Sequence, residues 1–158
     1  MKYGKQQSGF SLIELLVVIA VILIITAVAI PSLLRSKIAA NEASAVGSLR
    51  TLNSACINYS TAWGTGFPLA LSRLGPGKPA TAVAADLIDS VLATGTKSGY
   101  KLIYVSGAPA KGTIGTYTIN ANPATPNITG TRYFFTDQTG VIRYKIGGAA
   151  TVASKPIG

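Results

Sequence analysis

A run of mostly apolar residues from Phe10 to Ile30 is the most pronounced pattern in the sequence. Only Ser11, Glu14 and Thr26 among its 21 residues are not apolar. As an α-helix rising 1.5 Å per residue, the run is about 31 Å long, which is close to the thickness of a bilayer's hydrocarbon core. Apolar side chains occupy every face of such a helix. The pattern therefore predicts a membrane span.

After Pro31 the pattern changes to a one-sided helical stripe. Its members follow one another at steps of 4, 7, 4, 3, 4, 3 and 4 residues: Leu34, Ile38, Ala45, Leu49, Leu52, Cys56, Tyr59 and Trp63. These steps are typical of an amphipathic helix, and the longest one is filled by the polar turn that contains Asn41 and Glu42. We therefore predict one long helix from Phe10 to about Trp63, with its second half packed on a globular head.

A change in composition marks the start of that head. From Gly64 onward the chain holds 14 of its 17 glycines and 7 of its 8 prolines. One short helix (Ala84–Ala93) and four strand-like runs are expected there: Tyr100–Val105, Thr116–Ala121, Arg132–Thr136 and Val141–Ile146. The last two runs flank a short polar turn and are read as a β-hairpin. The fold class that follows is α+β, with a long N-terminal α-helix packed on a small antiparallel sheet of about four strands.

The residues at the front of the apolar run carry a family resemblance. The sequence GFSLIEL from Gly9 to Leu15, followed by apolar residues and Pro31, resembles the N-terminus of type IV pilins and pseudopilins. The resemblance implies that a prepilin peptidase cleaves after Gly9, that the new N-terminal Phe10 is N-methylated, and that Glu14 drives assembly. Pro31 stands at the position of the family's helix-bending proline, so a kink is expected there, since proline removes one helical hydrogen bond. Ser11 stands where threonine is more common in the family.

These observations give four segments. They are a leader peptide over residues 1–9, a transmembrane and assembly helix over 10–31, the amphipathic half of the helix over 32–63, and the globular head over 64–158. Lys2 and Lys5 precede the span and keep that end cytoplasmic by the positive-inside rule. The resemblance implies a precursor in the inner membrane and, after assembly, an extracellular filament, or a periplasmic one for a pseudopilin. The implied partners are identical subunits, prepilin peptidase and the assembly machinery.

Composition limits the chemistry available to the head. The chain has no histidine and one cysteine, Cys56, so His/Cys metal sites and an intramolecular disulfide are excluded. Asp86, Asp89 and Asp137 are the only acids after Gly64. Asp137 alone offers too few ligands for calcium, and no nucleophile has an activating base. We therefore predict a protein that is not an enzyme and that uses no cofactor and no metal.

Three alternatives remain open on the sequence alone. The first is a major pseudopilin of a type II secretion system, because it shares the whole N-terminus and because Tyr59, Gly64 and Phe67-Pro68 weakly resemble a pseudopilin pattern. The second is a membrane-anchored binding protein that never polymerises, although such a protein has no use for Glu14. The third adds nucleic acid as a partner and rests only on the net charge of +9, which is +7 without Lys2 and Lys5.

Overall fold

The computed structural model describes residues 9–157, and the contacts within it divide the chain into two units. The first unit extends to Ser36 and the second begins at Lys37. Helix α1 (Leu12–Trp63) supplies the whole helical part of the first unit and the first element of the second. It remains helical through Pro31. The kink and the four segment boundaries expected from the sequence stay predictions.

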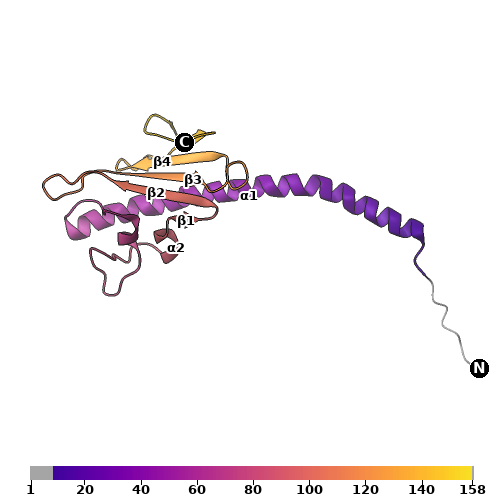
Figure 1. Cartoon of the computed structure of the whole chain (residues 1–158), viewed down its shortest axis with the longest axis horizontal. Helices are drawn as coiled ribbons and strands as arrows, with labels where there is room; N and C mark the ends of the chain where they lie inside the picture. The colour runs from indigo at the N-terminus through magenta and orange to yellow at the C-terminus, as the bar shows by residue number, and fades with distance from the viewer. Residues whose placement is uncertain (1–8, 158) are drawn as a thin grey trace, which may run out of the picture. The chain divides into compact units, whose positions relative to one another are not determined.

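The second unit contains a six-stranded antiparallel sheet in which the strands follow their order in the chain (Figure 1). The strands are β1 (Thr96–Lys97), β2 (Tyr100–Ser106), β3 (Tyr117–Pro123), β4 (Arg132–Asp137), β5 (Arg143–Ile146) and β6 (Lys155–Pro156). A 3₁₀ turn, η1 (Leu71–Leu74), and a short helix, α2 (Ser90–Ala93), precede the sheet. The predicted α+β class and the predicted β4–β5 hairpin are both confirmed.

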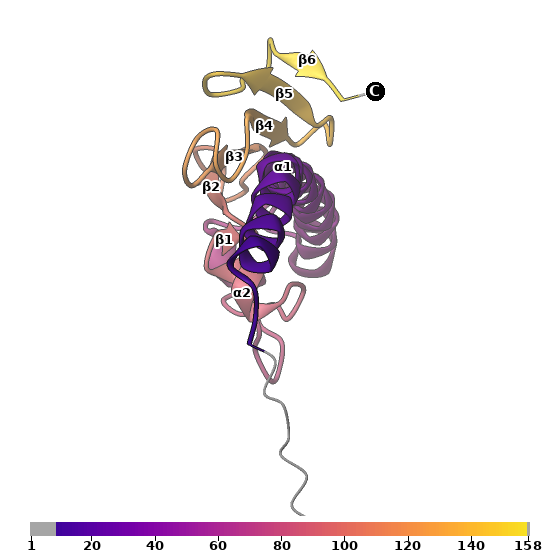
Figure 2. The same cartoon turned by 90° about the vertical axis from the view of Figure 1, so that its right-hand side faces the viewer.

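One face of this sheet packs on the second half of α1. Burial alternates along β3, with Tyr117, Ile119 and Ala121 turned inward, because successive strand residues point to opposite faces. These side chains share one buried cluster with Leu49 and Leu52 of α1. The sheet extends beyond the helix, so that β1 lies at one end with α2 beside it, and β5 and β6 lie at the other end (Figure 2).

Three expectations about the head need correction. The stripe on α1 is buried from Glu42 onward, whereas Leu34 is 44 % exposed and belongs to the first unit. The sheet has six strands rather than about four, since β1 and β6 are two residues long and leave no periodic signal. The helix expected over Ala84–Ala93 is formed only from Ser90 to Ala93.

The physical reason for the shorter helix is a competing set of backbone hydrogen bonds. The N–H groups of Ala85, Asp86 and Leu87 donate to the carbonyls of residues 73, 75 and 74, respectively, in and just after η1, so they are not free for helical bonds. Asp86 has a φ of 53°, outside the helical region. Asp89 then caps α2, because its carboxylate accepts the N–H of Leu92 at 2.6 Å.

Cys56 lies in the core under the sheet and is fully buried. Burial raises the pKa of its thiol to about 12, because the thiolate is poorly solvated there. We expect a thiol reagent to modify it at least about 100-fold more slowly at pH 8 than after unfolding in urea, since the thiolate is the reactive form. The measurement is labelling followed by intact mass. Equal rates in the folded and unfolded protein would show that the thiol is accessible.

Candidate functional site

The Gly9–Phe10 junction lies at the exposed end of the first unit. The Phe10 side chain is 87 % exposed, and a Cβ placed on Gly9 would meet no atom within 4 Å. Packing within residues 9–157 therefore does not require glycine at this position. The peptide bond between the two residues is open to another protein, which is what cleavage at this point needs.

Ser11 and Glu14 interact at the start of α1. The Glu14 carboxylate accepts the backbone N–H of Ser11 at 2.9 Å. Ser-x-x-Glu at a helix start is the sequence of a capping box, and this contact is its glutamate half. A negative side chain in the first turn also interacts favourably with the helix dipole. The carboxylate is thus held at the end of the helix where Phe10 lies.

The side chains around Glu14 are apolar, and no other element of the first unit packs against them. A hollow of about 400 Å³ is lined by Glu14 and four apolar residues: Phe10, Ile13, Val17 and Val18. From Leu12 to Leu34 every large apolar side chain is at least 44 % exposed, and the most apolar 18-residue window of α1 has a mean hydropathy of 3.1 with no buried residue. The Thr26 hydroxyl donates a hydrogen bond to the carbonyl of Ile22 at 2.7 Å, so this polar group has its partner within the helix. This surface suits lipid or other apolar helices.

A second carboxylate, Glu42, holds the head to α1 and was missed by the sequence reasoning. Glu42 is 4 % exposed and accepts four hydrogen bonds from Arg132, the first residue of β4, and from Thr131 just before it. Thr131 donates its N–H at 2.8 Å and its hydroxyl at 2.9 Å. Arg132 donates its N–H at 3.1 Å and its Nε at 2.6 Å. The signal was present, because steps of 4, 3 and 4 from Ile38 to Glu42, Ala45 and Leu49 place the glutamate on the stripe.

The electrostatics of Glu42 follow from these contacts. Burial by itself raises the pKa of the Glu42 carboxyl, but the hydrogen bonds from Thr131 and Arg132 favour the carboxylate and leave the pKa below its ordinary value. The Arg132 guanidinium also lies 5.5 Å from the ring centre of Phe134 and 5.7 Å from that of Tyr144. Glu42 is therefore an ionised structural anchor rather than a proton donor.

Asp89 and Asp137 make separate local contacts in the head. Asp89 caps α2 and lies 3.4 Å from Lys97, and Asp137 accepts the N–H of Thr139 at 2.9 Å. Over residues 9–157 no group of three or more His, Cys, Asp or Glu side chains could hold a metal ion. Within this part of the chain, the site with distinctive chemistry is the start of α1.

Comparison with known proteins identifies the same segment. The family model for the prokaryotic N-terminal methylation motif matches residues 4–30. The chain thus carries the leader of type IV pilins and pseudopilins, as the resemblance predicted. No curated protein matches the chain, and no solved structure does. The residues after 30 are therefore interpreted from their own structure.

Proposed function

We propose that the protein is the structural subunit of a type IV pilus or a pilus-like filament, cleaved after Gly9, methylated at Phe10 and polymerised through α1. One observation carries the proposal. The chain combines the methylation motif with a single carboxylate, Glu14, on a helix surface that is otherwise apolar and exposed. An ionisable group within a membrane span is costly and usually functional.

The assembly step follows from the two environments available to the helix. In the membrane, lipid covers the apolar side chains from Leu12 to Leu34, and in a filament the same surface packs against other copies. Small residues such as Ala20, Ala27 and Ala29 allow helices to approach closely. Glu14 would pair with the α-amino group that cleavage creates on Phe10 of a neighbouring subunit. Pairing two charges that are buried together fixes the register between subunits as well as attracting them.

Processing is the first test of the proposal. The protein in purified filaments is expected to begin at Phe10 and to carry one added methyl group on its amine. Intact-mass measurement with N-terminal fragment ions checks both. A chain that begins at Met1, or one cut after Ile30, would contradict the proposal because no free amine would then lie next to Glu14.

A secretion pseudopilus is the second candidate, since the methylation motif is common to pilins and pseudopilins. Deleting the gene separates the two roles. Loss of surface filaments with normal protein secretion supports a pilus subunit, and loss of secretion without loss of surface filaments supports a pseudopilin. A strain that loses neither would support a membrane-anchored protein that does not polymerise.

A further inference from the structure

Among residues 37–157 of the second unit, exposed negative charge is confined to one segment. Residues 37–157 contain 11 lysines and arginines but only four acids. Two of these acids are buried, with Glu42 4 % and Asp137 7 % exposed. The other two, Asp86 and Asp89, are exposed and lie just before α2. Any contact between two such heads that is favoured by charge must therefore involve this segment.

Apolar side chains accompany these two aspartates. Val83 is 65 % exposed and Val91 is 55 % exposed. Lys97 offsets part of the negative charge, because its Nζ lies 3.4 Å from Asp89. Asp86 forms no salt bridge among residues 9–157. The segment from Val83 to Val91, termed the acidic segment here, thus presents carboxylates between two exposed valines.

The opposite end of the sheet has the complementary character. Strands β5 and β6 carry Arg143, Lys145 and Lys155, and no acid occurs between Asp137 and Ile157. Arg143 donates to the carbonyl of Ser154 at 3.2 Å, whereas neither Lys145 nor Lys155 forms a salt bridge in the part of the chain that the structure describes. This leaves two lysines available to a partner.

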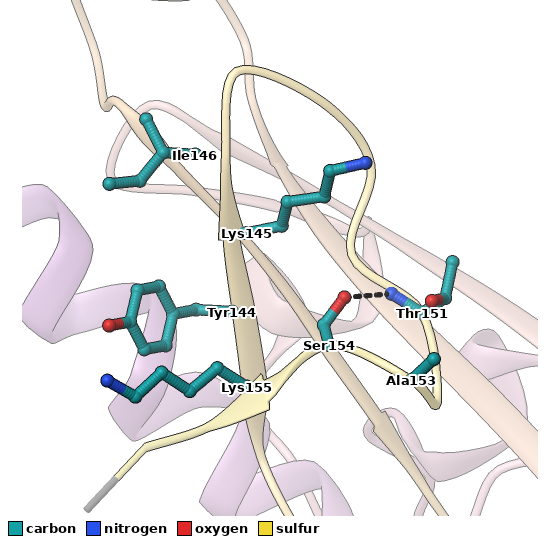
Figure 3. Close-up of a pocket in the computed structure, with 7 residues that line it drawn as sticks. All are labelled: Tyr144, Lys145, Ile146, Thr151, Ala153, Ser154 and Lys155. Atoms are coloured by element: carbon teal, nitrogen blue, oxygen red, sulfur yellow. Dashed lines mark hydrogen bonds between the residues drawn. The ribbon is translucent and has the colours of Figure 1, made fainter.

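A shallow hollow of about 480 Å³ lies between these lysines (Figure 3). Tyr144 and Lys155 lie side by side, as their register pairing requires, and Lys145 points to the other side of β5. Ile146 is 67 % exposed at the rim. One side of β5 at this hollow therefore offers an aromatic ring and an aliphatic side chain beside the Lys155 ammonium group, whereas Lys145 lies on the other side of the strand; the hollow is termed the basic hollow here.

The acidic segment and the basic hollow cannot meet within one chain. Helix α2 contacts β1, which is one edge of the sheet, and β6 is the other edge (Figure 2). Five strand spacings of roughly 4.8 Å separate the two edges by about 24 Å. The two surfaces are thus different patches on opposite ends of the same sheet. Two different patches that fit each other join copies head to tail. A row of copies joined in this way can continue without closing into a ring.

We propose that the acidic segment of one copy docks in the basic hollow of the next, with Val91 against Tyr144 and Ile146 and with the two aspartates near Lys155. This contact rests on the proposed filament and adds a second interface to the one made by α1. It brings opposite charges together between heads that otherwise repel each other, because each carries a net charge of +7 over residues 37–157.

A cysteine pair tests the contact directly. A chain carrying both Val91→Cys and Ile146→Cys should give a ladder of disulfide-linked multimers when filaments are oxidised, because the two thiols meet only between copies. Each single variant should stay monomeric on a non-reducing gel, and buried Cys56 should not contribute. Filaments of normal yield without a ladder, or dimers from Ile146→Cys alone, would overturn the proposed contact. Failure of the unmodified protein to form filaments would instead count against the proposed function.

Charge reversal gives an independent test with a matched control. Lys155→Glu should lower the yield of sheared filaments about fivefold relative to membrane-bound protein, since the attraction to the aspartates becomes a repulsion. Lys111→Glu makes the same change in net charge at an exposed position away from the hollow and should leave the yield within about twofold of normal. Equal yields from the two variants would overturn the proposal, because net charge alone would then account for the result.

Discussion

Replacing Glu14 by valine is expected to abolish filaments while the protein still accumulates in the membrane. The carboxylate costs roughly 2–3 kcal/mol in an apolar span, so valine should insert at least as well. What the variant loses is the partner of the Phe10 amine in the assembled state. An unpaired charge buried between helices costs about 3–5 kcal/mol, which corresponds to roughly 10²–10⁴-fold weaker subunit association.

The hydrogen bond between Glu14 and Ser11 calls for a control that separates capping from charge. Glutamine also serves at the third position of a capping box, so Glu14→Gln keeps an acceptor for the Ser11 N–H but removes the negative charge. We expect Glu14→Gln to fail nearly as completely as Glu14→Val. Glu14→Asp keeps the charge with a reach one methylene shorter, and its yield should fall between those of glutamine and glutamate.

The measurement compares sheared surface filaments with membrane-bound protein by immunoblot, with each variant expressed in the absence of the unmodified chain. Normal filaments from Glu14→Val would show that the carboxylate is not needed, and the filament proposal would lose its main residue-level support. Normal filaments from Glu14→Gln alone would assign the role to helix capping rather than to charge.

The outline of the fold could be predicted from sequence because it depends on local periodicity. The long apolar run, the stripe that includes Leu49 and Leu52, and the alternation in β3 each repeat over several turns or residue pairs. The start of α1 could be recognised because Gly9, Phe10 and Glu14 stand at fixed spacings within one motif. These features need no knowledge of distant contacts.

The features that escaped prediction depend on distant contacts. The segment 84–89 has a helical pattern of apolar residues, but its backbone bonds to residues 73–75 instead. Glu42 looked like a break in the stripe because its partners, Thr131 and Arg132, are about 90 positions later in the chain. The pairing of an acidic segment with a basic hollow likewise needs the order of strands, which places them at opposite edges.

Removing the Glu42 carboxylate is expected to have the largest effect on the stability of the head. Glu42→Gln loses the charge that pairs with Arg132 and, with its amide N–H₂ in the place of Oε2, faces the Arg132 Nε–H, which can only donate. Arg132 is 37 % exposed and stays partly solvated, so we expect a loss of about 2–3 kcal/mol in the free energy of unfolding rather than the larger cost of a fully buried pair. Thr131→Val removes one hydroxyl donor and should cost about 1 kcal/mol.

The same pair gives the stability of the head a defined dependence on pH. The pKa of Glu42 is lower in the folded state than its value of about 4.3 in an unfolded chain, so the folded state releases this proton more readily. The resulting stabilisation is fully present above pH of about 4.3 and is lost as the pH falls through the lower folded pKa. The difference in unfolding free energy between the unmodified protein and Glu42→Gln should therefore be constant from pH 7 to about pH 5 and shrink below that.

Urea unfolding of the full chain in detergent, followed by fluorescence of the single tryptophan, Trp63, measures both proteins at each pH. A difference that does not change between pH 7 and pH 3 would show that the contribution of Glu42 does not come from its charge.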